Sequence, residues 1–303
     1  MISTEFNTIL ELLNAFPDEQ TCIDHLTELR WPDGAVVSPF DSESKVYGCA
    51  NNRYRCKNTG KYFNVKTATL FDNTKVKLQK WFLAIWLVTS HKKEISSIQL
   101  SKDIGVTQKT AWFMLHRIRN CFGFDNDLNN EVEVDETYVG SKSKNKHAPK
   151  RGEGEQGRST KEKAPELGMV ERRGKLNAKC VGDVTIRTLT TEIVNSVNDA
   201  TIYSDELPGY NALKRIYDYQ FIKHGQGQYV NGRVHTNTIE GFWSLLKRGI
   251  VDIYHFTNVK HLQKYVDEFV FRYNSREQDE SQKFNLLLSN TEYRMTYKDL
   301  INV

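Results

Sequence analysis

Hydrophobic residues recur at helical spacing in the N-terminal part of the chain, interrupted by short runs that alternate like β-strands. The first helix would open with Ser3 or Thr4 as its N-cap. The helix after Lys75 is apolar over a wide face and is expected to be buried. The elements that these patterns predict are helices at 3–15, 21–29 and 75–88 and short strands at 53–56 and 61–65.

After residue 130 the pattern predicts an α/β fold. Strand candidates are separated by shorter helical stretches, and two longer amphipathic helices follow. This order is typical of a mixed sheet flanked by helices. The strands are expected at 132–139, 167–172, 179–186 and 200–203, and the helices at 191–197, 210–217, 238–248 and 262–273.

The segment from Ser96 to Arg119 reads as two helices joined by a turn at Gly105, with Thr107 as the N-cap of the second helix. This pattern is typical of a helix-turn-helix, whose second helix enters the major groove of DNA. A plain helical hairpin would show the same hydrophobic spacing. The polar start of the second helix favours DNA binding, and the residues predicted to contact DNA are Gln108, Lys109, Thr110, Arg117 and Arg119.

The composition is that of an ordinary soluble protein, since 39% of the 303 residues are hydrophobic and 26% are charged. The longest apolar run, 81–88, is far shorter than the roughly 20 residues that span a bilayer. The N-terminus lacks the pattern of a secretory signal. Five scattered cysteines indicate reduced thiols rather than a disulfide framework. We therefore expect a cytoplasmic protein without a membrane span.

Positive charge is concentrated in one segment. Eight Lys or Arg and three Glu between Lys142 and Lys163 give a surplus of +5, so the rest of the chain sums to −1 of the net +4. Such a segment can be a solvated loop or can contact a phosphate backbone. The residues predicted to contact DNA there are Lys142, Lys144, Lys146, Lys150 and Arg151.

Acidic residues gather on one face of the predicted strand at 131–139. Val132 and Val134 point to the opposite face, because side chains alternate along a strand. Carboxylates on one face repel one another unless a cation lies nearby or the strand is at a sheet edge. Asp135 lies deepest in the strand and is the favoured metal ligand, whereas Glu136 points to the other face. The acidic face comprises Glu131, Glu133, Asp135 and the hydroxyl of Thr137.

Two further carboxylates follow in the chain. Asp205 ends a predicted strand and would point into the crevice where open α/β sheets bind ligands; its neighbour Glu206 could equally be an N-terminal charge of the next helix. Glu240 lies in the helix at 238–248, on a polar stripe that an ordinary amphipathic surface helix would also show. The stripe comprises Asn237, Glu240, Ser244 and Lys247.

Together these carboxylates are typical of metal-dependent phosphoryl transfer. Mg²⁺ prefers carboxylate oxygens and keeps positions open for water and phosphate. Two such ions can activate the attacking oxygen and stabilise the leaving one, while Lys247 contacts a phosphate. The sequence contains neither Gly-x-Ser-x-Gly nor a Walker phosphate-binding motif, so a serine hydrolase or an ATP-driven function is not expected.

At these residues the chain resembles DDE transposases of the bacterial insertion-sequence group related to Merlin elements, which carry an ISXO-like transposase domain. The likeness covers nearly the whole chain. It rests on Trp31-Pro-Asp-Gly34, on Gln99-Leu-Ser-Lys-Asp-Ile-Gly-Val-Thr-Gln-Lys-Thr-Ala-Trp112, on Val134-Asp-Glu-Thr-Tyr-Val-Gly140, on Tyr203-Ser-Asp205 and on His235-Thr-Asn-Thr-Ile-Glu-Gly-Phe-Trp-Ser-Leu-Leu-Lys-Arg248.

The resemblance implies an RNase H-like α/β catalytic domain preceded by a small zinc-ribbon-like β module and a helix-turn-helix domain. It also implies cleavage of DNA at the element ends and strand transfer to target DNA. Both reactions would use two Mg²⁺ or Mn²⁺ ions. The expected divisions are N-terminal helices at 1–30, the ribbon module at 31–74, the helix-turn-helix domain at 75–123, the catalytic domain at 124–290 with a basic insertion at 141–165, and a tail at 291–303.

By motif, the resemblance assigns metal binding to Asp135, Asp205 and a third group in the 237–240 region. Related proteins carry Asn or Glu there, so whether Glu240 alone or together with Asn237 completes the site stays open. The seven-residue step from Glu240 to Lys247 favours Glu240. Lys247 is expected to contact a phosphate at the catalytic site. Arg248 is expected to contact the DNA backbone.

The ribbon module departs from the family pattern. The family's four zinc-binding cysteines correspond to Ser38, Asp41, Cys56 and Thr59, which leaves one cysteine of four. We therefore expect no structural zinc.

The partners implied are double-stranded DNA, as terminal inverted repeats and target, and a second copy of the chain in a homodimer or larger assembly, acting at the bacterial nucleoid. Two alternatives remain: a catalytically silent DNA-binding protein derived from a transposase, and an RNase H-like DNA nuclease.

Overall fold

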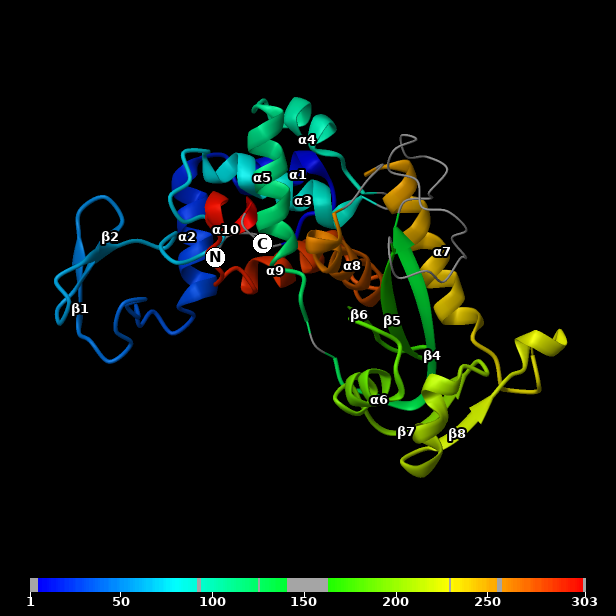
Figure 1. Ribbon diagram of the computed structural model, residues 1–303. Helices are drawn as coiled ribbons and strands as arrows, with labels where there is room; N and C mark the ends of the chain where they lie inside the picture. The colour runs from blue at the N-terminus through cyan, green and yellow to red at the C-terminus, as the bar shows by residue number, and fades with distance from the viewer. Residues whose placement is uncertain are drawn as a thin grey trace. The chain divides into compact units, whose positions relative to one another are not determined.

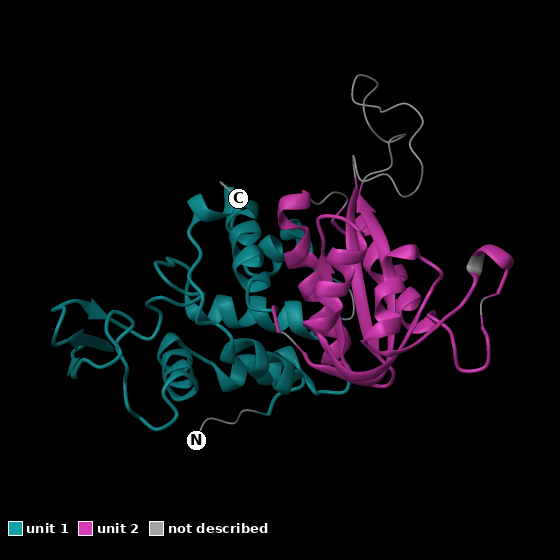
Figure 2. Ribbon diagram, turned by 60° about the horizontal axis from the view of Figure 1, so that its bottom comes forward, with its two compact units in different colours: residues 1–122, 277–303 teal, residues 123–276 magenta. Residues whose placement is uncertain are grey.

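The computed structural model (Figure 1) divides into two compact units, which have different colours in Figure 2. Unit 1 comprises residues 1–122 and 277–303, and unit 2 comprises residues 123–276. The residues that the structure describes are 5–91, 94–124, 126–140, 163–228, 230–254 and 258–301.

Unit 1 is mainly helical and is built around the buried helix α3. Phe82 of α3 packs edge-to-face on Phe16 and on Phe284, with ring centroids 4.9 and 5.3 Å apart. Such aromatic contacts stabilise a core beyond the area that they bury. The helices are α1 (Ile9–Ala15), α2 (Glu19–Arg30), α3 (Leu78–Ser90), α4 (Ser97–Asp103), α5 (Gln108–Arg119), α9 (Glu280–Ser289) and α10 (Tyr297–Ile301).

Helix α1 begins at Ile9 rather than near residue 3, because Thr8 and Glu11 form a reciprocal capping box there. The compact unit that holds the five-stranded sheet ends at Arg276. Phe284 places α9 in the aromatic core of unit 1.

Helices α4 and α5, joined by a turn, lie where the sequence predicted two helices. Ser96 caps α4, and the Thr107 hydroxyl accepts a hydrogen bond from the Thr110 backbone N–H at the start of α5, at 3.2 Å. Gly105 occupies the turn with φ +60°, a conformation that glycine adopts without steric cost.

The β module in unit 1 is a three-stranded antiparallel sheet in the order β1 (Val46–Cys49), β2 (Arg53–Cys56) and β3 (Tyr62–Phe63). Cys56 is fully buried at the end of β2. Burial raises the pKa of its thiol, but hydrogen bonds with Ser38, Ser44 and Thr59 outweigh burial and lower the pKa to about 6. Hydroxyl groups therefore surround the Cys56 thiol, and Ser38 also forms a backbone bridge with Asp41.

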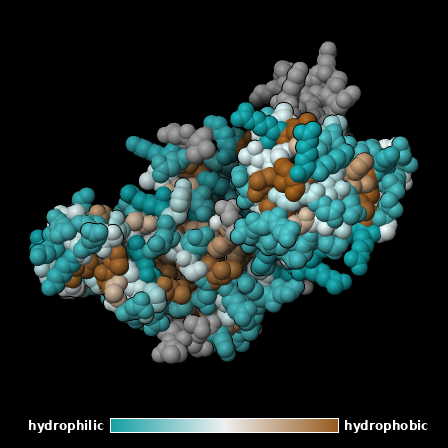
Figure 3. All heavy atoms as spheres, turned by 90° about the horizontal axis from the view of Figure 1, so that it is seen from below, coloured by the Kyte–Doolittle hydropathy of each residue, from teal (hydrophilic) through white to brown (hydrophobic). Residues whose placement is uncertain are grey.

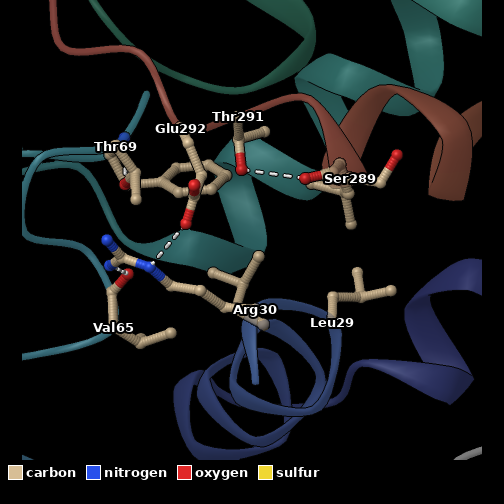
Figure 4. A pocket seen from close by; sticks show the side chains of 10 residues that line it. Leu29, Arg30, Val65, Thr69, Ser289, Thr291 and Glu292 are labelled. Atoms are coloured by element: carbon tan, nitrogen blue, oxygen red, sulfur yellow. Dashed lines mark hydrogen bonds and ion pairs between the residues drawn. The ribbon is translucent and has the colours of Figure 1, made fainter. Parts of the chain in front are cut away.

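The C-terminal segment lines a pocket of about 230 Å³ at the base of this module (Figure 4). The Arg30 guanidinium donates to the Val65 carbonyl at 2.8 Å and forms an ion pair with Glu292 at 3.1 Å. Arg30 thus joins α2, the β module and the segment after α9 within unit 1.

Unit 2 is a five-stranded mixed sheet in the order β6–β5–β4–β7–β8. The strands β4, β5 and β6 are antiparallel neighbours, whereas β7 is parallel to β4 and β8 is parallel to β7. Their bounds are β4 (Leu128–Gly140), β5 (Lys163–Glu171), β6 (Leu176–Cys180), β7 (Val197–Ser204) and β8 (Asp218–Phe221).

Helices cover both faces of this sheet, as Figure 1 shows. On one face, α7 and α8 pack against a core that includes Val139 and Val170. On the other face, α6 and the 3-10 helix η3 pack against Val132 and Val134. The bounds are α6 (Ile186–Val194), η3 (Pro208–Arg215), η4 (His224–Gln226), α7 (Asn237–Asp252) and α8 (Val259–Asn274).

The sequence patterns predicted β4, β5, β7, α7 and α8 in their observed places, but the strand predicted at 179–186 is wrong in its second half. β6 ends at Cys180, and Thr185 caps α6 through a hydrogen bond from the Thr188 N–H. Strand β8 was not predicted because its four residues are largely exposed. Among the described residues, no helix is long and apolar enough to cross a membrane.

A buried carboxyl group in the sheet predicts a pH-dependent stability. Glu166 on β5 is fully buried and accepts a hydrogen bond from the Cys180 thiol on β6, at 2.9 Å. Burial raises the pKa of Glu166 from its usual 4.5 to about 8, the Cys180 hydrogen bond opposes this shift, and the charge of Asp267 adds to it. The folded state therefore binds a proton that the unfolded state releases above pH 4.5. The contribution to stability is full below that pH and is lost as the pH rises through about 8.

We expect the free energy of unfolding to fall with pH in this range by up to about 1.4 kcal/mol per pH unit from this group. Urea unfolding of the wild type and of Glu166→Gln at several pH values measures this fall. The free energy of unfolding of the variant should fall less with pH, because an amide of the same shape does not titrate. Identical pH dependence in both proteins would contradict this assignment.

Candidate active site

Three carboxyl groups converge where β7 ends beside its parallel neighbour β4. β4 and β7 pair in a register that sets Glu133 opposite Tyr203, so Asp135 lies level with Asp205, which directly follows β7. Ligand oxygens of Asp135, Glu136 and Asp205 lie within 4.8 Å of one another. The sequence predicted the convergence of Asp135 and Asp205, but not the participation of Glu136.

Burial and the crowding of negative charge change the acidity of Asp135. Burial, together with the charges of Glu136, Asp205 and Glu240, raises its pKa from 3.8 to about 8. The Trp243 indole N–H donates a hydrogen bond to Asp135 Oδ2 at 3.1 Å. A set of oxygen donors that repel one another in this way fits a hard divalent cation, which offsets the repulsion.

The other two carboxylates of the cluster are held by local hydrogen bonds. The backbone N–H of Leu207 donates to Asp205 Oδ1 at 2.8 Å, which fixes the turn after β7. The hydroxyl of Tyr210, on η3, donates to Glu136 Oε2 at 3.0 Å. Glu136 therefore does face the helix layer opposite α7, as strand alternation predicts, yet it still reaches the cluster because β4 extends beyond the end of β7.

Helix α7 brings the polar stripe next to Asp135. Glu240 is close enough to raise the pKa of Asp135, and its Oε1 accepts a hydrogen bond from the Thr236 hydroxyl at 2.8 Å. It lies outside the group of three carboxyls that share the 4.8 Å limit. Burial lowers the pKa of Lys247 and the nearby Asp135 charge opposes that shift, so Lys247 also lies near the cluster. Asn237 is exposed at the first position of α7.

Glu133, which shares a strand face with Asp135, fixes the start of α7. Its fully buried carboxylate accepts hydrogen bonds from the backbone N–H groups of Thr238 and Ile239, at 2.8 and 3.2 Å, and from Arg172 Nε at 2.9 Å. The N-cap residue Thr236 makes no side-chain cap, so Glu133 supplies the cap from a neighbouring strand. No sequence pattern indicates this role of Glu133, because it depends on partners far along the chain.

A glycine in β5 lets α7 approach the sheet. Gly168 pairs with Asp135, and a Cβ atom built on it would lie less than 3 Å from side-chain atoms of both Trp243 and Ile239. A glycine inside an apolar strand is a sequence signal of such close approach.

We expect Gly168→Ala to destabilise the fold by about 1–3 kcal/mol, because the methyl group overpacks the sheet–helix contact. Gly182→Ala is the matched control, since a Cβ at Gly182 meets nothing within 4 Å. Urea unfolding compares the two variants. An equal effect of both substitutions would show that α7 does not need the space at Gly168.

A cleft of about 570 Å³ runs beside the cluster. One wall is the end of β4 and the start of β5, and the other is the second half of α7. Two basic side chains predicted to contact phosphate, Lys247 and Arg248, lie along it together with Lys163. The lining residues are Glu136, Thr137, Tyr138, Val139, Gly140, Lys163, Lys247, Arg248, Ile250, Val251 and Asp252.

The start of α5 is exposed, as the DNA-binding prediction requires. Gln108 and Lys109 are exposed, Gln108 donating to the Ser97 hydroxyl at 2.8 Å and Lys109 lying 5.0 Å from the ring centroid of Tyr297. Thr110 is half-buried beside the cap residue. The predicted contacts Lys142, Lys144, Lys146, Lys150 and Arg151 lie outside the described residues.

Arg117 and Arg119, which were predicted to contact DNA, are buried. Arg117 donates to the Asp72 carbonyl at 2.9 Å and its guanidinium lies 5.5 Å from the centroid of the Trp81 ring. Burial lowers its pKa to about 10. Arg119 is 2% exposed. The C-terminal half of α5 thus packs inside unit 1 and leaves only its first turn for a partner.

Comparison with known proteins agrees with this geometry. The ISXO2-like transposase domain matches residues 127–274, which hold the whole sheet and α7 and α8. A Halobacterium salinarum protein, described as an uncharacterized protein in transposable element ISH50, is 31% identical over 252 residues, covering 78% of this chain and 84% of that protein. The chain belongs to the ISXO2-like transposase family.

Members of this family are DDE transposases, and the cluster of Asp135, Glu136 and Asp205 lies inside the matched domain. Two solved structures are also similar to the chain. The Mos1 strand transfer complex is 11% identical with a TM-score of 0.29, covering 94% of this chain and 92% of that one. A pre-cleavage Mos1 transpososome is 12% identical with a TM-score of 0.24, covering 94% and 97%.

Proposed function

We propose that this DDE transposase moves an insertion sequence by binding its terminal inverted repeats, cutting the element ends and joining them to target DNA. The observation that carries the proposal is the convergence of Asp135 and Asp205 on adjacent parallel strands, with Glu240 on a helix beside them. The strand order and the helices on both faces are those expected of an RNase H-like domain.

The residues proposed to hold Mg²⁺ or Mn²⁺ are Asp135 and Asp205, completed by Glu240 with or without Asn237. When bound, two such ions would activate the attacking oxygen and stabilise the leaving oxygen at phosphorus. Lys247 lies close enough to Asp135 to contact a non-bridging phosphate oxygen beside them. In the joining step, the 3′-hydroxyl oxygen of the element bonds to a target phosphorus as the target's own 3′ oxygen leaves.

DNA recognition is proposed for the first turn of α5, through Gln108, Lys109 and Thr110, and DNA backbone contact for Lys247, Arg248 and the insertion at 141–165. The relative in ISH50 belongs by name to a transposable element, which supports DNA as the substrate. Two ends must be brought together, so we also propose a homodimer or larger assembly on DNA, in the cytoplasm. The hydroxyl groups around Cys56 support a β module that needs no zinc.

A single joining assay tests the proposal. Purified protein is incubated with Mg²⁺, DNA that carries the element's terminal inverted repeats, and a target plasmid. A transposase joins the ends to the plasmid, and EDTA prevents it. Cutting without joining would instead favour the nuclease alternative, and binding without cutting would favour a catalytically silent DNA-binding protein.

A further inference from the structure

We propose that the exposed face of the β1–β2–β3 sheet is a second DNA-binding surface, which grips the backbone of duplex DNA without reading its sequence. We call this surface the ribbon face; it consists of Lys45, Tyr47, Arg53, Arg55 and Tyr62. The inference rests on DNA being the substrate, as proposed above, but it concerns binding rather than catalysis.

The charge of this segment is one-sided. Residues 45–66 contain four Lys and two Arg and no Asp or Glu, a surplus of +6 in 22 residues. The basic segment from Lys142 to Lys163 has the same length but carries three Glu and a surplus of +5. A dense cationic segment without acids is the electrostatic pattern of a surface that displaces counterions from nucleic acid.

The strand register places these residues on one face. Tyr47 pairs with Arg55, and Arg55 pairs with Tyr62, so the three side chains form a row across the sheet. Arg53 lies two residues from Arg55 and therefore shares its face. All of these side chains are exposed. The exposed fraction is 43% for Tyr47 and 51% for Tyr62.

The opposite face of the same sheet holds the module together. Tyr54 packs on Trp31 and Phe63 with ring centroids 5.5 Å apart in both pairs, and Cys56 is buried beside them. The aromatic residues of the ribbon face therefore do not serve the core. Packing of the core does not explain why two large rings and three cations face solvent on the ribbon face. Exposed aromatic side chains that cluster with cationic ones are typical of surfaces that bind nucleic acid.

The rings also hold the cations in place. The Arg53 and Arg55 guanidinium groups lie 4.8 and 5.8 Å from the centroid of Tyr62, and Lys45 Nζ lies 5.6 Å from that of Tyr47. A guanidinium stacked on an aromatic ring keeps its charge and its N–H donors, and it loses less side-chain entropy when it binds a phosphate. Lys66 and Asp72 of this module form ion pairs with Glu19 and Arg294, and both lie off the ribbon face.

Figures 1 and 3 show that the module projects as a lobe of unit 1, with mainly hydrophilic residues on the side seen in Figure 3. A projecting sheet with one packed face and one cationic face fits the side of a DNA duplex. Recognition through phosphates would make this contact insensitive to sequence.

The test measures full-length protein binding to a fluorescent random-sequence DNA duplex by anisotropy, over a series of NaCl concentrations. Arg53→Gln/Arg55→Gln should bind about 10-fold more weakly, and the slope of log affinity against log salt should shrink by about 1.8, or 0.9 for each lost phosphate contact. Arg53→Lys/Arg55→Lys keeps the charge and should retain the wild-type slope. Arg187→Gln/Lys298→Gln removes two exposed charges elsewhere and should change neither quantity.

The inference is overturned if Arg53→Gln/Arg55→Gln keeps the wild-type affinity and slope, if the Arg187/Lys298 control loses as much, or if the loss appears with an RNA duplex and not with DNA. If the double Gln variant does not fold, the single variants decide, each with an expected slope change of about 0.9. A wild type that binds DNA through these arginines but joins no ends would leave this inference standing while overturning the proposed function.

Discussion

We expect Asp135→Asn and Asp205→Asn each to reduce DNA joining by at least about 10³-fold while DNA binding is retained. Asn keeps the shape of the side chain but removes the charge that holds a divalent cation. Loss of about 4 kcal/mol of transition-state stabilisation corresponds to this factor. The joining assay measures the rate, and anisotropy with the same inverted-repeat DNA measures the binding.

Glu206→Gln is the matched control for these variants. Glu206 directly follows Asp205, but its Oε1 accepts a hydrogen bond from the Gly225 N–H at 2.8 Å and it does not belong to the group of three carboxyls. Joining by Glu206→Gln should stay within a few-fold of the wild type. Wild-type joining by Asp205→Asn would remove the basis of the proposed site.

The same assay decides the third ligand. Glu240→Gln should abolish joining if Glu240 completes the site, whereas Glu136→Gln should have a smaller effect because Glu136 is tied to Tyr210 on the opposite helix layer. The reverse order of effects would make Glu136 the third ligand.

The second large effect is expected for Glu133→Ala, which should lower the free energy of unfolding by about 3–5 kcal/mol. Removing Glu133 from this buried ion pair leaves Arg172 with the longer contact to the half-exposed Glu131, at 3.8 Å. Two backbone N–H groups at the start of α7 lose their acceptor as well. Urea unfolding measures the change.

Glu131→Ala serves as the control, because Glu131 lies on the same strand face but its side chain is 37% exposed. Glu131→Ala should lower the free energy of unfolding by about 1 kcal/mol or less, because its ion pair with Arg172 is partly solvated. Similar values for the two variants would mean that Glu133 does not cap α7.

The sequence was sufficient where the decisive contact is local. Thr107 was identified as a cap because its partner lies three residues away, and Asp205 was identified because the end of a strand fixes where its side chain starts. The alternation along β4 likewise put Asp135 and Glu136 on opposite faces.

Sequence reasoning failed where the outcome depends on what packs against an element. Arg117 and Arg119 lie at positions that a free helix would expose, but unit 1 buries them. Glu133 and Asp135 have the same strand parity, yet Arg172 and the start of α7 engage only the first. No local pattern distinguishes two carboxylates whose roles are set by residues 39 and 105 positions away.

The most direct test of the proposed metal site is a titration of the metal-free protein with Mn²⁺, followed by electron paramagnetic resonance, for the wild type and for Asp135→Asn/Asp205→Asn. We expect the wild type to bind Mn²⁺ and the double variant, folded to the same extent by circular dichroism, not to bind it. Equal Mn²⁺ binding by both proteins would contradict it.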